Sequence, residues 1–283
     1  MEEVRERIAA LPARQRAELL RRLRGTGNPM ASWIVPMPAR PAAALRLFCL
    51  PYAGGGAAVF RSWGAALGDT VEVCAVQPPG REARIGEPAY KRMGPLVAAL
   101  AAAIEAHLDR PFAFYGHSMG ALIAFELARH LRRTGRPQPV RLLLAAYRAP
   151  QLPNPNIKIY HLPDEVLKAV LHTDGTPARI LANDELMRAA LPTLRADFEL
   201  CDTYEYAPEE PLACPLTVFG GAEDVRVSAA DLQGWREHSA IACSIIRLPG
   251  GHFFVHSAQD QLLAEVARHL RGDLAVGEGE SHG

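Results

Sequence analysis

A serine flanked by glycines, in Gly116-His117-Ser118-Met119-Gly120, stands at the junction between an apolar run and a helical pattern. The apolar run is Pro111–Tyr115, and the helical pattern begins at Ala121. A turn this sharp between a strand and a helix excludes bulky neighbours, so glycines flank it and the serine side chain points outward. The five-residue pattern alone recurs by chance. In this setting, it predicts that Ser118 is a nucleophile.

A serine hydroxyl is a weak nucleophile at neutral pH, so it needs a base, and the base needs an acid that orients it. Downstream, an apolar segment ends in Gly220-Gly221 and is followed at once by Asp224. A second apolar segment leads into Gly250-Gly251-His252. The order serine, aspartate, histidine is typical of α/β-hydrolases. We therefore predict that Asp224 is the acid and His252 the base.

Both assignments have competitors. Asp224 could serve only as the first residue of a helix, and Glu223 and Asp231 are the nearest alternative carboxylates. The chain has ten histidines, of which His256 is the closest rival of the predicted base. His117 adjoins the serine, and its ring is not expected to reach the hydroxyl as a base.

An oxyanion hole is the fourth part of such a site. The glycines Gly54–Gly56 follow an apolar strand pattern and leave backbone N–H groups available to a substrate oxygen. In this architecture one donor comes from that loop and the other from the residue after the nucleophile. We predict the N–H groups of Ala53 and Met119. A phosphate-binding loop is disfavoured, because G-x-G-x-x-G would need glycine where Val59 stands.

Charge and cysteine usage exclude several classes of function. The formal net charge is zero over 283 residues, so no overall field favours nucleic acid or an anionic membrane. The five cysteines form no C-x-x-C pair, which favours a reducing compartment, the cytoplasm. No apolar run is long enough to span a bilayer, and no signal peptide is visible. We expect no metal and no organic cofactor.

Strand and helix patterns alternate along the chain. This alternation predicts an α/β fold with a mostly parallel sheet and helices on both faces. The predicted site residues follow the carboxyl ends of strands, where such sheets bind ligands. The predicted strands are 45–50, 71–76, 112–115, 140–146, 215–219 and 242–248, and the predicted helices are 93–108, 119–133, 229–239 and 258–270.

Three segments depart from the alternation. We predict an N-terminal helix and a proline-rich linker in residues 1–44. We predict a flexible tail in residues 272–283. The hydrolase domain is then 45–271. Between about 151 and 210 the strands stop, and short helices are expected at 164–172, 177–182 and 184–191, with another through Phe198 and Tyr206. We interpret this insertion as a helical lid, with a rigid structural insertion as the alternative.

Five motifs in this order resemble the discrete type II thioesterases of polyketide and nonribosomal peptide pathways. They are Leu47–Gly55, Gln77–Arg84, Phe114–Ala121, Phe219–Asp224 and Pro249–Phe254. The resemblance implies an α/β-hydrolase that removes stalled or unwanted acyl groups from phosphopantetheine arms, with acyl and peptidyl carrier domains as partners. It also implies Ser118, Asp224 and His252 as triad and Ala53 and Met119 as oxyanion donors.

Some residues depart from the family pattern. Tyr52 stands where the family often has histidine, and both Tyr147 and the stretch 154–160 look atypical. The strand after the elbow helix ends without a carboxylate, so Asp224 has to be the acid, as in the discrete enzymes. Arg81 and Arg84 could meet an acidic carrier domain, but a solvated loop is favoured.

Other functions use the same residues. A carboxylesterase acting on small oxygen esters would share every predicted catalytic residue. Acyl transfer or cyclisation of a carrier-bound chain is another alternative and would require exclusion of water. A binding module without catalysis is disfavoured, because no part of the machinery is missing.

Overall fold

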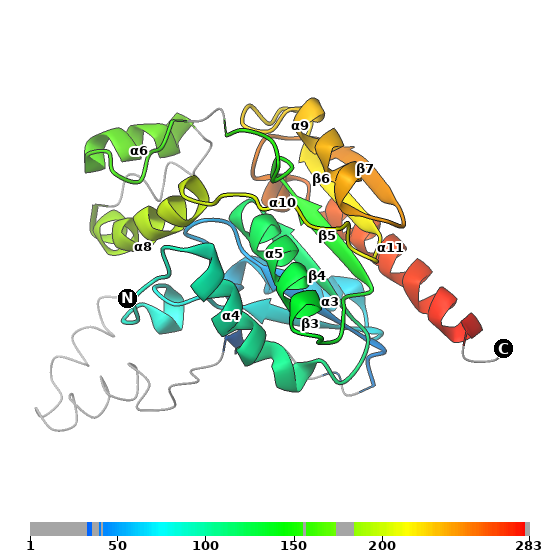
Figure 1. Cartoon of the computed structure of the whole chain (residues 1–283). Coiled ribbons are helices and arrows are strands. Elements are labelled where there is room, and N and C mark those ends of the chain that lie inside the picture. Colours follow the sequence, from blue (N-terminus) through cyan, green and yellow to red (C-terminus); the bar gives the residue numbers. More distant parts are fainter. Residues whose placement is uncertain (1–32, 36–39, 41, 155–156, 174–183, 281–283) are drawn as a thin grey trace, which may run out of the picture.

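One seven-stranded sheet forms the centre of the molecule, in a computed structural model that describes residues 33–35, 40, 42–154, 157–173 and 184–280 (Figure 1). The strand order is β1-β3-β2-β4-β5-β6-β7. Only β1 is antiparallel to its neighbour, and the other six strands pair in parallel. The predicted α/β class is confirmed. The strands are β1 (Ile34–Val35), β2 (Leu45–Leu50), β3 (Val71–Val76), β4 (Phe112–His117), β5 (Arg141–Ala145), β6 (Leu216–Gly221) and β7 (Cys243–Leu248).

Helices cover both faces of this sheet. On one face lie α4 (Met93–Ile104) and α5 (Met119–Arg133), and on the other lie α3 (Trp63–Leu67), α10 (Phe254–Ser257) and α11 (Gln259–Glu280). A further short helix, α9 (Ala229–Gln233), follows β6. Short 3-10 helices span Ala57–Phe60, Glu82–Arg84, Glu105–His107 and Gly234–His238.

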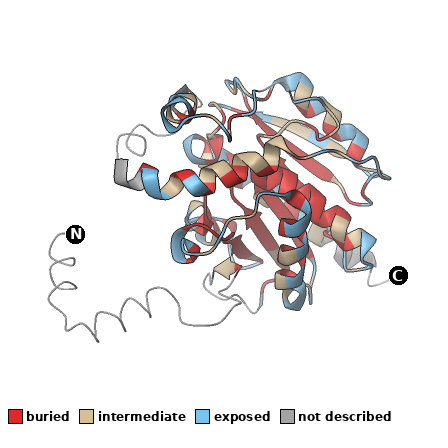
Figure 2. Ribbon diagram, turned by 60° about the vertical axis from the view of Figure 1, so that its left-hand side comes forward, coloured by how far each residue is buried: buried red, intermediate tan, exposed pale blue. Residues whose placement is uncertain are grey.

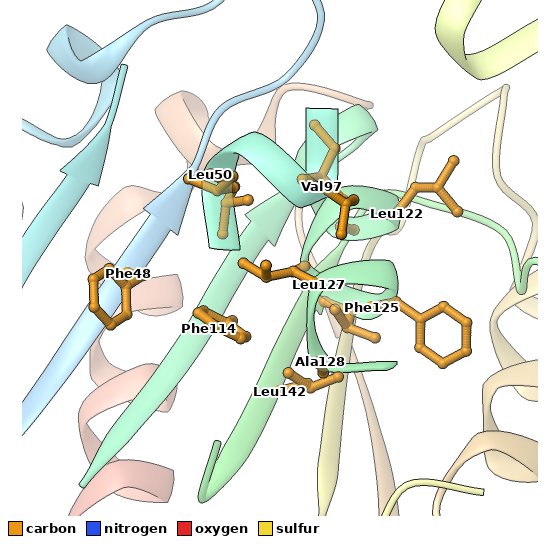
Figure 3. Close-up of a cluster of buried hydrophobic side chains, with 14 of the residues drawn as sticks. Phe48, Leu50, Val97, Phe114, Leu122, Phe125, Leu127, Ala128 and Leu142 are labelled. Carbon is orange, nitrogen blue, oxygen red and sulfur yellow. The ribbon is translucent and has the colours of Figure 1, made fainter. Parts of the chain in front are cut away.

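Side-chain alternation along the strands builds two apolar clusters. On β2, Phe48 and Leu50 belong to the cluster under α4 and α5, whereas Leu47 and Cys49 belong to the cluster on the opposite face. Figure 3 shows Phe48, Leu50 and Phe114 with the labelled α5 side chains to their right. Strand β4 is buried along its whole length, and Figure 2 shows the strands at the centre of the molecule in the colour of buried residues. Because both faces are covered, β4 reads as a continuous apolar run.

The insertion after β5 contains two long helices, α6 (Asp164–Thr173) and α8 (Asp184–Asp202). They share a small apolar cluster that includes Leu167 and Leu191. The sequence predicted a helix that stops at 191 and a separate one beyond it, but α8 continues through Pro192. Proline in a helix interior removes a hydrogen bond, and burial of Leu191, Ala196 and Leu200 on both sides of it keeps this helix continuous. The helix predicted at 177–182 lies outside the described residues.

The ends of the chain also differ from the predictions. Ile34 and Val35, placed in a linker by the sequence, pair with β3. Helix α11 continues to Glu280, past residue 272 where a flexible tail was predicted. Two hydrogen bonds from Arg141 to Asp273, of 2.6 and 2.7 Å, hold this extension on the sheet. The helix predicted within residues 1–44 lies outside the described part, and in the described part no helix has the length and apolarity to cross a membrane.

Candidate active site

Ser118 occupies the turn between β4 and α5 with an unusual backbone conformation. Its φ is 53° and its ψ is −120°, values that a non-glycine residue adopts only when the surrounding structure enforces them. Its N–H donates to the carbonyl of Ala145 at 2.7 Å. A Cβ on Gly116 would lie 2.1 Å from the carbonyl oxygen of Gly120, and one on Gly120 would lie 2.2 Å from that of Leu50. The two flanking glycines are therefore required by close backbone approach.

The three predicted side chains meet in one chain of hydrogen bonds. His252 Nε2 lies 2.9 Å from Ser118 Oγ, and His252 Nδ1 lies 2.9 Å from Asp224 Oδ2. The Asp224 side chain is fully buried. Burial alone would raise its pKa, but the hydrogen bond with His252 and those from the backbone N–H groups of Arg226 and Val227 lower it below its ordinary value. The carboxylate therefore stays ionised, as an acceptor for the imidazole.

The hydrogen bonds that join the triad do not involve the competing residues. Glu223 is exposed, and Asp231 forms a capping box with Ser228 at the start of α9. His256 Nε2 lies 2.9 Å from the hydroxyl of Tyr52. Tyr52 is one of the residues that depart from the family pattern, and burial raises the pKa of its phenol. The phenol of Tyr52 therefore stays neutral while it shares this hydrogen bond with His256.

His117 has a position that the sequence did not reveal. Its side chain is fully buried, and its Nε2–H donates to the backbone carbonyl of His252 at 2.8 Å. The Tyr115 hydroxyl lies 3.3 Å from Nδ1. Burial, together with the nearby imidazole of His252, lowers the pKa of His117 to about 3. A neutral His117 thus connects the turn that contains Ser118 to the loop that contains His252.

The glycine loop after β2 makes a tight turn beside the serine. The N–H of Gly55 donates to the carbonyl of Tyr52 at 2.9 Å, and Gly54 has a φ of +74°, as the third residue of a type II turn does. This turn does not use the N–H of Ala53. Met119 is the first residue of α5, where backbone N–H groups have no acceptor within the helix. Ala53 and Met119 both line the cavity that contains Ser118 and His252.

The cavity above Ser118 has a volume of about 90 Å³. The insertion forms one wall of it, through Ile159 and, from α8, Phe198 and Cys201. Asp202 of α8 also lines the cavity, and burial raises the pKa of its carboxyl group. Among the residues that the structure describes, no group of three or more His, Cys, Asp or Glu side chains is placed to hold a metal ion.

Arg81 and Arg84 do not form a solvated loop, and that prediction is wrong. Each is only 5% exposed. Arg84 makes two hydrogen bonds to Glu87 and stacks over the Trp33 ring at 4.6 Å. Arg81 pairs with Asp197 of α8, 116 positions away in the sequence. Their charges are satisfied inside the fold, which a local sequence pattern could not show.

Comparisons with known proteins identify the family of this chain. The thioesterase domain model matches residues 45–274. The Brevibacillus parabrevis protein named linear gramicidin dehydrogenase LgrE is 42% identical and covers 86% of this chain and 94% of the relative. Despite that name, the glycine loop here lacks the spacing of a dinucleotide-binding loop.

Solved structures give the same result. The RedJ thioesterase of prodiginine biosynthesis in Streptomyces coelicolor has a TM-score of 0.76 and 39% identity, covering 83% of this chain and 91% of that one. The type II thioesterase BorB of the borrelidin cluster has a TM-score of 0.75 and 35% identity, covering 84% and 96%. The chain therefore belongs to the thioesterase family, as a hydrolase of thioesters whose close homologues are type II thioesterases of nonribosomal peptide and polyketide pathways.

Proposed function

We propose that this enzyme removes acyl groups from the phosphopantetheine arms of acyl and peptidyl carrier domains, with Ser118, His252 and Asp224 as its catalytic triad. The observation that carries the proposal is the unbroken hydrogen-bond chain from Asp224 through His252 to Ser118, at the floor of a cavity. A carrier domain as the partner is supported by similar proteins whose names place them in linear gramicidin and borrelidin biosynthesis. Five free cysteines support the cytoplasm as its location.

The first half of the reaction forms an acyl-enzyme. Ser118 Oγ attacks the thioester carbonyl carbon while His252 Nε2 accepts the hydroxyl proton. The negative oxygen of the tetrahedral intermediate receives hydrogen bonds from the N–H groups of Ala53 and Met119. The carbon–sulfur bond then breaks, and the protonated His252 gives its proton to the departing pantetheine thiol. Asp224 holds the imidazole in the required tautomer and stabilises its cation.

The second half regenerates the enzyme. Water attacks the acyl-serine carbonyl and loses a proton to His252, and the same two N–H groups hold the second oxyanion. The bond to Ser118 Oγ breaks and the serine regains its proton from His252. The products are a carboxylic acid and a free carrier thiol.

Release of one acyl group from a loaded carrier domain, compared with hydrolysis of its p-nitrophenyl ester, tests this proposal. We expect kcat/KM to be higher for the carrier thioester, and both activities to be lost in Ser118→Ala. A preference for the ester regardless of carrier would indicate a carboxylesterase. Formation of a cyclic or transferred product instead of the acid would indicate acyl transfer, and full activity in Ser118→Ala would refute the proposed nucleophile.

A further inference from the structure

A buried ion pair lies directly behind the glycine loop of the site. Arg81 donates two hydrogen bonds to Asp197, with distances of 2.9 and 2.8 Å to its two carboxylate oxygens. The side chains of Arg81 and Asp197 are 6% and 4% exposed. Removal of one partner leaves a buried charge without compensation, so a pair of this kind persists only in a defined geometry.

The pair holds the loop at two consecutive residues. Asp197 Oδ2 accepts a hydrogen bond of 2.7 Å from the N–H of Gly54, and Arg81 Nη1 donates one of 3.0 Å to the carbonyl of Gly55. Gly54 directly follows Ala53, so the Gly54 N–H belongs to the peptide group that begins at Ala53. The Ala53 N–H lies in the preceding peptide group, which is linked to this one through φ and ψ of Ala53 alone, so holding one peptide restricts the direction of the other.

The contact between α8 and the loop is also steric. A Cβ on Gly54 would lie 2.6 Å from Leu194 of the same helix, so helix and loop already touch. One turn before Asp197, the Thr193 hydroxyl donates to the carbonyl of Gly80 in the segment that carries Arg81. Three neighbouring residues of α8 thus fix the helix to the loop and to its support.

We propose that Asp197 and Arg81 are positioning residues, which fix the glycine loop so that the N–H of Ala53 points at the oxyanion, and thereby couple the insertion to catalysis. The proposal rests on the proposed function in one respect, the formation of an oxyanion at Ser118. It adds a role for the insertion beyond shaping the cavity. When the loop is no longer held in this direction, the acyl group can still bind, but the transition state loses one of its donors.

The test compares Asp197→Asn and Asp197→Ala with Glu199→Gln. Asparagine keeps an acceptor for the Gly54 N–H but loses the charge opposite Arg81, and alanine removes both. Glu199 is a matched control on the same helix, because its ion pairs of 2.6 and 3.3 Å join α8 to Arg92 and Lys91 rather than to the loop. p-Nitrophenyl acetate serves as substrate, because its hydrolysis by Ser118 passes through the same oxyanion whether or not a carrier domain is the natural partner.

The expected result is a fall in kcat of about tenfold for Asp197→Asn and about a hundredfold for Asp197→Ala, at nearly unchanged KM. These losses approach the roughly 100- to 1,000-fold effect of removing an oxyanion donor itself. The affinity for butylboronic acid, whose tetrahedral adduct with serine places an oxygen in the hole, should fall by the same factors. Glu199→Gln should retain kcat and boronate affinity.

A purely structural role would give a different pattern. If the Asp197 variants melt at lower temperature but keep kcat and boronate affinity at temperatures where they are folded, the proposal is overturned. An Asp197→Asn variant that retains full boronate affinity while Asp197→Ala fails to fold would also overturn the role of the charge pair. Failure of the proposed function is separately visible, because it would leave Ser118→Ala active or direct activity away from carrier thioesters.

Discussion

The imidazole of His117 donates a hydrogen bond to the backbone carbonyl of His252, at 2.8 Å, from within the turn of the nucleophile. Two segments separated by 135 positions are joined by this contact. A protonated His117 could no longer accept the Tyr115 hydroxyl at Nδ1, and its charge would lie beside His252 in a fully buried place. The neutral form is therefore part of the folded site.

This burial predicts an acid-sensitive stability. The pKa of His117 falls from an ordinary 6.5 in the unfolded chain to about 3 in the folded protein. Between these values the unfolded chain binds a proton that the folded protein does not, so stability decreases as pH falls through that window. One proton corresponds to a slope of at most about 1.4 kcal/mol per pH unit.

Urea unfolding of the wild type and His117→Asn at several pH values between 7 and 4 measures this slope. We expect the free energy of unfolding to depend less steeply on pH in His117→Asn. His161→Asn is the control, because His161 is exposed and its replacement should leave the wild-type slope. Equal slopes for wild type and His117→Asn would contradict the prediction.

The sequence revealed those parts of the site that depend on local pattern. The glycines around Ser118 are required by the close approach of backbones at one turn. Asp224 and His252 follow strands whose ends can be predicted from apolar runs in the sequence. The role of His117 could not be predicted, because it depends on a loop that only the folded sheet brings near. Arg81 was predicted to be solvated because no acidic partner is evident near it in the sequence. Its partner, Asp197, lies on a distant helix. Pro192 suggested a helix end that tertiary packing overrides.

Replacement of Asp224 by asparagine should impair catalysis without disrupting the fold. Asparagine keeps the size of the side chain but presents an amide where the imidazole needs a carboxylate, so the histidine loses its oriented tautomer and the partner of its cation. We expect kcat for p-nitrophenyl acetate to fall by about 10⁴-fold. Glu223→Gln, a change in the adjacent exposed carboxylate, should retain activity. Loss of activity in both variants would contradict the assignment of Asp224 as the acid.

The second residues of α4 and α5 are both glycine, yet they should respond oppositely to alanine. At Gly120 the new Cβ would lie 2.2 Å from the carbonyl oxygen of Leu50, whereas at Gly94 it meets nothing within 4 Å. We expect Gly120→Ala to destabilise the protein by about 3 kcal/mol or more. Gly94→Ala should stabilise it by roughly 0.5–1 kcal/mol. Thermal unfolding of both variants decides this, and similar melting temperatures would refute the steric explanation.

The size of the cavity predicts a preference for short acyl groups. A single water needs about 10–15 Å³ of such space, so a cavity of about 90 Å³ holds roughly six to nine heavy atoms. An octanoyl group with its carbonyl oxygen and thioester sulfur exceeds that number. We expect kcat/KM to decrease from acetyl through butyryl to octanoyl thioesters. Phe198→Ala, which removes a ring from the cavity wall, should raise the octanoyl rate relative to the acetyl rate. An octanoyl preference in the wild type, or an unchanged ratio in Phe198→Ala, would contradict the prediction.

Phe198 and Asp197 are consecutive residues of α8, one on the cavity wall and the other on the glycine loop. If a chain too large for the cavity displaces Phe198, we expect α8 to withdraw Asp197 from Gly54 as well. Oversized chains would thus be held without being cut. We therefore expect the helix to act as a rate filter, under which short acyl groups are hydrolysed faster than long ones.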